Sequence, residues 1–396
     1  MFKSPIPASR GMRLERLRKF AYDQLNGPPF LNQKYAMRHH FSTAQTLVND
    51  IRQALPLRDA RYYKPYEQRI VMGTLFFSVS SICNAKCVFC AYKDGKGPKG
   101  NMPFETFKKA ADEYASMGGK VISFTPTVGD PLVDPGLLKK IHYAVSLPGI
   151  ERVLFYTNGI ALPKNDLYRK LIDSGIQDLR ISMAETEREG YNRIYGVKAY
   201  DVMINGVHKL LQYNRECGEP VAVSINFRSS KGPQDVLDSP DFKQYIAPYL
   251  SGRVMYDFIN DYDNWGGTIK EEDLEGVMRM RRIPRMKRMP CIKTFDLMVL
   301  FNGAVRLCAC RFVETEFDEL IVGNIHQESL RDIFYGSRVA ALREAFVDNT
   351  LPPVCATCSL YQPATVRWLE RRARNERTYH LLPFAEPASR KQRVTS

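Results

Sequence analysis

Three cysteines within eight residues constrain this chain more than any other feature. Cys83, Cys87 and Cys90 are spaced as Cys-x3-Cys-x2-Cys, directly after a β-branched and aromatic run at 74–79 that predicts a strand. Three thiolates are one too few for a closed structural zinc site. They suit an iron-sulfur cluster in which one iron is left without a protein ligand and can bind a cofactor. The alternative is a zinc loop completed by a distant fourth ligand.

The compartment decides how the cysteines are interpreted. Among 396 residues there is no run of 18 apolar residues, and the stretch 1–5 lacks the apolar core of a secretion signal. We therefore expect a cytoplasmic protein with no membrane partner. In that compartment the nine cysteines should be reduced, and clusters of them are read as metal ligands before disulfides.

Short apolar runs alternate regularly with longer amphipathic stretches over residues 73–261. The runs that predict strands are 74–79, 121–127, 152–157, 178–183, 221–228 and 253–259. Between them, Pro103 begins one predicted helix and Gly118 ends it, Asp134 caps a second, and Gly175 ends a third. This pattern predicts an α/β fold with a parallel sheet, a partial (βα)6 TIM-like barrel. Its chemistry should lie at the C-terminal ends of the strands.

The texture of the sequence divides the chain into four parts. We predict a helical N-terminal extension (1–70), the barrel (71–270), a small cysteine-rich domain (271–363) and a basic C-terminal tail (364–396). Within the extension, Ser42-Thr43-Ala44-Gln45 is a capping box that opens a helix through Leu55.

The first cysteine motif, with its aromatic residue before the last cysteine, resembles the hallmark of the radical S-adenosylmethionine (radical SAM) superfamily. The resemblance extends along residues 73–363 and includes a Gly-Asp-Pro stretch at 129–131 where the family has Gly-Glu-Pro. Because Asp replaces Glu, the backbone role of this stretch transfers more directly than its side-chain role. The cofactor-binding residues that the resemblance implies are Phe89, Gly129, Asp130, Asn158, Ser182 and, for the cofactor carboxylate, Arg193.

A second set of cysteines resembles the SPASM/twitch extension of the same superfamily. Cys291 is followed by Gly303 and Cys308, and later by Cys355 and Cys358. The resemblance implies that these four cysteines ligate one auxiliary 4Fe-4S cluster, in addition to the cluster that binds S-adenosylmethionine. A fully ligated cluster suits electron transfer. The alternative is a structural zinc held by the same four residues.

Two cysteines are left over. Cys217 follows a predicted helix, and we interpret it as an inert thiol. Cys310 lies two residues from a predicted ligand, so it could replace Cys308, act on substrate as a catalytic thiol, or be buried as a small apolar side chain.

The resemblance implies reductive cleavage of S-adenosylmethionine and removal of a substrate hydrogen atom by the 5′-deoxyadenosyl radical. Our leading interpretation is a radical SAM oxidoreductase that dehydrogenates a small-molecule or sugar-like substrate, with the auxiliary cluster as electron acceptor. If Cys310 instead returns a hydrogen atom, the enzyme is a radical epimerase. A peptide-modifying maturase is a further alternative.

The net charge of +14 is concentrated in three segments: 1–20, 278–293 and 364–396. Because 278–293 leads into Cys291, we infer that it faces an anionic small-molecule, sugar or peptide substrate, or a flavodoxin- or ferredoxin-type reductant. The basic segments also admit a different class, a non-catalytic metal-cluster protein that binds nucleic acid. We favour the enzyme because no recognisable nucleic-acid module accompanies them.

Overall fold

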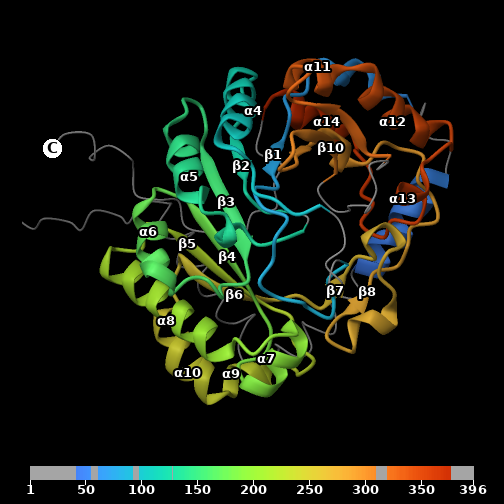
Figure 1. The fold of residues 1–396 in the computed structure, drawn as a ribbon. Coiled ribbons are helices and arrows are strands. Elements are labelled where there is room, and N and C mark those ends of the chain that lie inside the picture. Colours follow the sequence, from blue (N-terminus) through green and yellow to red (C-terminus); the bar gives the residue numbers. More distant parts are fainter. Residues whose placement is uncertain (1–41, 55–60, 92–97, 127, 309–318, 376–396) are drawn as a thin grey trace, which may run out of the picture.

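The fold is built on one nine-stranded sheet with the order β11-β10-β9-β1-β2-β3-β4-β5-β6. The computed structural model describes residues 42–54, 61–91, 98–126, 128–308 and 319–375 (Figure 1). Six strands run parallel in chain order: β1 (Thr74–Phe77), β2 (Val121–Ser123), β3 (Arg152–Thr157), β4 (Asp178–Met183), β5 (Ala222–Phe227) and β6 (Val254–Phe258). All six predicted strands are present, which confirms the α/β class with its parallel sheet.

Helices follow the strands and cover the outer face of the sheet (Figure 1). They are α4 (Phe104–Ser116), α5 (Leu137–Ser146), α6 (Leu167–Asp173), α7 (Arg188–Tyr195), α8 (Tyr200–Glu216), α9 (Pro233–Asp238) and α10 (Pro240–Tyr245). Pro103 is the N-cap of α4, and the chain turns at Gly118 and Gly175 with positive φ. These three helix ends are as predicted, because proline suits a helix start and glycine the left-handed turn that ends one. The predicted cap of the second helix was wrong by two residues: Gly136 is the N-cap of α5, and the Asp134 side chain accepts from the Gly136 amide before the helix begins.

The cysteine-rich part of the chain continues the same sheet. β9 (Leu297–Val299) pairs in parallel with β1, and β10 (Ala304–Leu307) and β11 (Ile321–Asn324) add antiparallel strands. The remaining helices here are α11 (Leu330–Tyr335), α12 (Ser337–Val347) and α13 (Pro353–Ala356). A separate two-stranded sheet pairs β7 (Asp261–Tyr262) with β8 (Arg279–Met280).

Single turns of 3-10 helix complete the connections: η1 (Pro131–Val133), η2 (Lys164–Asp166), η3 (Ala247–Tyr249), η4 (Trp265–Gly267), η5 (Glu271–Leu274) and η6 (Ile292–Phe295). Among the residues described, no helix combines the length and the apolar character needed to cross a bilayer.

The two ends of the described chain pack onto this framework. Residues 42–54 form the helix that the capping box predicts, while Leu55 and residues 1–41 lie outside the described residues. α14 (Val366–Ala373) and α3 (Lys64–Glu67) share a small core that contains Tyr63, Phe295 and Leu369. Part of the predicted basic tail is therefore a packed helix, in which buried Arg372 donates to the carbonyl of Val71.

Candidate functional site

Polar side chains line the inner face of the barrel sheet. Ile181 on β4 and Ile225 on β5 belong to the apolar core under the helices. Because side chains alternate along a strand, the next residue of each strand, Ser182 or Asn226, points to the opposite, inner face. The strand register places Ser182 beside Asn226 and Asn226 beside Asp257. One layer deeper, Arg180 donates to the hydroxyl of Tyr156 at 2.7 Å. The inner face thus presents hydroxyl, amide and charged groups to a bound molecule.

The loop with the first three cysteines is fixed against α7. The backbone amides of Lys86 and Val88 donate to the carbonyls of Tyr195 and Ile194, each at 2.9 Å. Cys87 and Cys90 are half-buried, and all eight described cysteines are thiols rather than disulfides. The loop follows β1, so its three thiols lie at the C-terminal edge of the sheet, as predicted.

The thiols of this loop disfavour one another's ionisation. Burial raises the pKa of Cys83 to about 12, with further contributions from Asp130 and Cys90. Burial also raises the pKa of Cys87 well above its usual value, followed by the effects of Cys90 and Cys83, while Arg228 opposes the rise. Three neighbouring thiols whose ionisation is disfavoured by burial and by one another are a donor set that a cationic iron-sulfur core can stabilise as thiolates. The residues present therefore fit such a cluster.

The Gly-Asp-Pro stretch at 129–131 connects the first cysteine loop to neighbouring strand ends by hydrogen bonds. The buried carboxylate of Asp130 accepts from the amides of Leu132 at 2.9 Å and Asn158 at 2.7 Å, and from the Thr157 hydroxyl. The backbone amide of Asp130 itself donates to Ile82. The Asp130 side chain is thus occupied with strand ends, and its contact with the cofactor stays a prediction.

The structure brings three other predicted residues to the same edge. The side-chain amide of Asn158 donates to the side-chain oxygen of Asn84 at 2.7 Å, and its nitrogen lies 3.8 Å from the sulfur of Cys83. The hydroxyl of Ser182 accepts from Tyr195 at 3.0 Å. The ring of Phe89 packs edge-on against that of Tyr195 at 6.2 Å.

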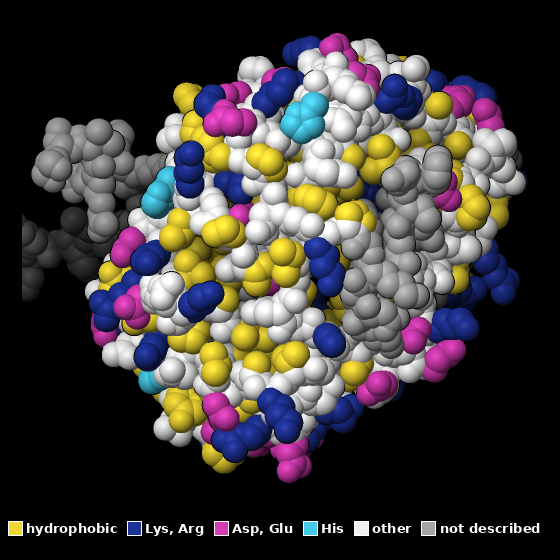
Figure 2. Space-filling view, in the orientation of Figure 1, with side chains coloured by type: hydrophobic (Ala, Val, Ile, Leu, Met, Phe, Trp, Pro, Cys, Tyr) yellow, Lys and Arg dark blue, Asp and Glu magenta, His cyan; other side chains and the backbone are white. Residues whose placement is uncertain are grey.

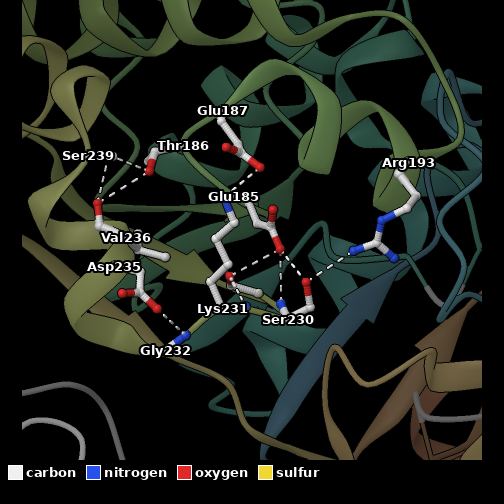
Figure 3. Close-up of polar contacts among 11 residues, drawn as sticks. Glu185, Thr186, Glu187, Arg193, Ser230, Lys231, Gly232, Asp235, Val236 and Ser239 are labelled. Atoms are coloured by element: carbon white, nitrogen blue, oxygen red, sulfur yellow. Dashed lines mark hydrogen bonds and ion pairs between the residues drawn. The ribbon is translucent and has the colours of Figure 1, made fainter.

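Arg193, on α7, takes part in a network that joins the loops after β4 and β5 (Figure 3). Its guanidinium donates to the hydroxyl of Ser230 at 3.0 Å and pairs with Glu275 at 3.5 Å. The Ser230 hydroxyl donates to the buried carboxylate of Glu185, and Lys231 pairs with Glu187 at 2.6 Å. The predicted contact of Arg193 with a cofactor carboxylate stays a prediction.

The second set of thiols converges on a single cavity. Its volume is about 510 Å³, part of it open to solvent, and its other lining residues are mostly apolar. The four cysteines that line it are Cys291, Cys308, Cys355 and Cys358. Burial is the main cause that raises the pKa of Cys291 to about 11 and of Cys358 to about 12, and in both the neighbouring Cys308 adds to the rise.

The spacing of these thiols bears on the kind of metal site. Within the described ranges, no three Cys, His, Asp or Glu side chains converge closely enough to hold one metal ion. Four thiols are the ligand number of a closed 4Fe-4S cluster and also of a structural zinc site, so both interpretations of this set stay predictions. Cys310, the proposed hydrogen donor, lies outside the described residues.

Two family profiles match the chain at these positions. The profile of the Radical SAM superfamily matches residues 77–225, which run from the last residue of β1 into β5 and include the first cysteine loop. That of SPASM, an iron-sulfur cluster-binding domain, matches residues 291–359, which contain the four cavity thiols. The chain belongs to the radical SAM superfamily. It carries a C-terminal SPASM domain. Its cofactors are therefore S-adenosylmethionine, the 4Fe-4S cluster that binds S-adenosylmethionine, and auxiliary iron-sulfur cluster content in the SPASM domain.

Curated relatives share the radical SAM part. The GTP 3′,8-cyclase of Clostridium perfringens is 28% identical over 155 residues, 38% of this chain and 45% of the relative. That of Chlorobaculum tepidum is 26% identical over 134 residues, 34% of this chain and 39% of the relative. The chain therefore spans less than half the length of these relatives.

Two solved structures are similar at low identity. BtrN in complex with AdoMet and 2-DOIA is 19% identical, with a TM-score of 0.46, and the match covers 72% of this chain and 92% of that one. The enzyme anSMEcpe with AdoMet and the Cp18Cys peptide is 13% identical, with a TM-score of 0.45 and coverage of 72% and 88%.

Sequence reasoning missed Arg228, which directly follows β5 in this radical SAM domain. Its guanidinium donates to the hydroxyl of Ser182 at 2.6 Å and lies 5.7 Å from the ring centre of Phe89. It also missed Asn226, the neighbour of Ser182 on the inner face, and Asp257, the neighbour of Asn226. The one available signal was their place at the ends of predicted strands, where the barrel chemistry is expected.

The basic segment 278–293 differs in part from its expected role. Lys287 does not face an anionic partner, because it is buried and its ammonium donates to three backbone carbonyls of the SPASM domain. Arg279, Arg285 and Arg288 of the segment are exposed. On the face in Figure 2, Lys and Arg side chains are dispersed among acidic and apolar ones.

Proposed function

We propose that this radical SAM enzyme dehydrogenates a small polyhydroxylated substrate, sugar-like in its chemistry, with an auxiliary cluster as the electron acceptor. The observation that carries the proposal is the convergence of Cys291, Cys308, Cys355 and Cys358 on one cavity. If all four thiols ligate one 4Fe-4S cluster, no iron is left open for substrate. Such a cluster suits electron transfer.

The polar side chains on the inner face of the barrel support the proposal that the substrate is polar. Ser182, Asn226 and Asp257 form one row across β4, β5 and β6, and the Tyr156–Arg180 pair lies one layer deeper. Hydroxyl, amide and carboxylate groups in such a row can orient several hydroxyl groups of a substrate at once. The bound cofactors supply the abstraction of a hydrogen atom from carbon.

The remaining electron and proton need separate acceptors. When an alcohol carbon has lost its hydrogen atom, formation of the carbonyl releases one electron and the hydroxyl proton. We assign the proton to the carboxylate of Asp257 and the electron to the auxiliary cluster. The substrate is then oxidised by two electrons in all, and its C–H and O–H bonds break as the C=O double bond forms.

The test is anaerobic turnover of the reconstituted enzyme with a panel of inositols, aminocyclitols, hexoses and their phosphates. The expected result is one carbonyl product per S-adenosylmethionine cleaved, with deuterium moving from a labelled substrate carbon into 5′-deoxyadenosine. A single turnover should also reduce the auxiliary cluster, which electron paramagnetic resonance measures.

Turnover in D2O separates the alternatives. A product without a carbonyl that has taken up solvent deuterium at the reacting carbon would contradict dehydrogenation and assign an epimerase. If a Cys310→Ala variant then lost that uptake, Cys310 would be the hydrogen donor. Turnover of a peptide, with none of the panel, would assign a maturase instead.

A further inference from the structure

Lys287 is the least exposed cation of the segment 278–293, with 6% of its surface accessible. Its ammonium donates to the backbone carbonyls of Cys355 at 2.7 Å, Ala356 at 2.8 Å and Cys358 at 2.7 Å. Three acceptors on one nitrogen need three N–H donors, which only the protonated amine provides. A positive charge is thus fixed on the backbone of the turn that carries two of the four cavity thiols.

The segment around Lys287 is held in turn by the N-terminal helix, residues 42–54. The carboxylate of Asp50 accepts from the amides of Arg285 at 3.2 Å and Met286 at 3.0 Å. Gln53 donates to the carbonyl of Met286 at 3.0 Å and accepts from the amide of Arg288 at 2.9 Å. Both side chains are buried, at 8% and 6% exposed. Bonds therefore fix the backbone on both sides of Lys287.

A further contact joins this helix to the SPASM domain directly. The hydroxyl of Tyr361 lies 2.7 Å from the side-chain oxygen of Gln53 and 2.8 Å from the carbonyl of Met289. Tyr361 also lines the cavity of the four thiols. The helix, the segment 285–289 and the cavity are thus connected by a continuous series of hydrogen bonds among buried groups.

We infer that Lys287 is a positioning residue for the auxiliary cluster, and that the helix 42–54 holds the backbone around Lys287 in place. Its three bonds fix the ligand turn between Cys355 and Cys358, and its charge favours the thiolate ligands and the reduced cluster. The inference rests on the proposed ligand set of the auxiliary cluster and is independent of the substrate.

The physical argument combines geometry with charge. Without the ammonium, three carbonyls next to the cavity would lose their donor in a buried place, where unsatisfied polar groups are costly. A fixed positive charge near a buried redox centre stabilises the state with the extra electron, because charges interact strongly away from water. Lys287→Met removes both effects, whereas Lys287→Arg keeps the charge and several donors.

The experiment compares four full-length variants after anaerobic reconstitution with iron and sulfide: Lys287→Met, Lys287→Arg, Gln53→Ala and, as matched control, Arg285→Met, whose side chain on the same segment is exposed. Iron per chain is counted, and the potential of each cluster is measured by electron paramagnetic resonance during redox titration. Two 4Fe-4S clusters require about eight iron atoms per chain.

For Lys287→Met we expect loss of about half of the iron, or retention of the iron with a more negative potential for the auxiliary cluster. The first cluster should keep its signal in both cases. Lys287→Arg should retain the iron, Gln53→Ala should lose a smaller share of it, and Arg285→Met should match the wild type.

Wild-type iron content and an unshifted potential in Lys287→Met would overturn the role of Lys287. Equal loss from both clusters would also overturn it, because the effect would then be general unfolding. If Lys287→Met does not fold, Lys287→Arg and Gln53→Ala decide, and wild-type behaviour of Gln53→Ala removes the role of the helix. A wild-type protein with about four iron atoms would overturn both this inference and the ligand set beneath it.

Discussion

The guanidinium of Arg228 bonds to the hydroxyl of Ser182 across 2.6 Å and so ties the end of β5 to the end of β4. The same guanidinium lies over the ring of Phe89 at 5.7 Å and opposes the rise in the pKa of Cys87. Arg228 therefore contacts two predicted cofactor-binding residues, Ser182 on the sheet and Phe89 on the cysteine loop.

We predict that Arg228→Met weakens binding of S-adenosylmethionine by about 10- to 100-fold, the loss expected for one charge-assisted hydrogen bond. Equilibrium binding to the reconstituted protein measures this effect, and Arg228→Lys should give an intermediate value. Iron content serves as the control for an intact first cluster. An unchanged dissociation constant with full iron would place Arg228 outside the cofactor site.

Gly129 has φ +98, and a Cβ atom there would lie 2.3 Å from the carbonyl oxygen of Ser80. We predict that Gly129→Ala displaces the Gly-Asp-Pro stretch from the loop it braces and costs about 1–3 kcal/mol of unfolding free energy. Iron retained by the first cluster should fall as well. Denaturant unfolding and iron counting test this, and wild-type values for both would contradict the prediction.

Asp257 is the carboxylate to which we assign the substrate proton. Asp257→Asn should lower turnover of the oxidised substrate by about 100-fold or more, as expected when a general base is removed. Binding of S-adenosylmethionine should be unchanged, because Asp257 has no assigned contact with it. A variant with wild-type turnover would transfer the proton to another acceptor.

Glu344 on α12 binds the residues around α3. Its carboxylate accepts from the hydroxyl of Tyr63 at 2.6 Å and pairs with Lys64 at 2.7 Å and with Arg61. The bonds from Lys64 and Tyr63 lower the pKa of Glu344 to about 2.

We therefore predict that Glu344→Gln lowers the free energy of unfolding by about 1–2 kcal/mol at pH 7. The wild-type advantage should be complete above about pH 4.5, the usual pKa of glutamate, and should disappear as the pH falls through about 2. Denaturant unfolding of both proteins from pH 7 to pH 2 tests this. A difference that does not change with pH would contradict the role of the charge.

Much of the barrel was predictable because its signals are local. The runs at 152–157 and 178–183 coincide with β3 and β4, since buried parallel strands need apolar β-branched and aromatic residues between short helices. The cysteine spacing likewise identified the first thiol group, because its three cysteines lie on one short loop, whereas the second group, spread over 291–358, was identified through its resemblance to the SPASM/twitch extension. Ser182 and Asn158 were implied by the family resemblance, and their places at strand ends agreed with it.

What the sequence did not reveal depends on pairing between distant segments. β1 and β9 are adjacent strands although they are separated by more than 200 residues, and no local pattern encodes that partnership. Lys287 stands among exposed arginines of similar composition, so its burial could not be distinguished in the sequence. Asn226 and Asp257 could be recognised only from the strand register, which sets Asn226 beside Ser182 and Asp257 beside Asn226.

The pairing of β9 with β1 has a mechanical consequence. Cys83 follows β1, while Cys291 and Cys308 flank the β9–β10 hairpin, so both thiol groups are attached to neighbouring strands of one sheet. Strands in a sheet are held at a fixed spacing by their backbone hydrogen bonds. An electron that crosses between the two centres would therefore meet a gap of constant width, set by the framework itself rather than by the docking of one mobile part on another.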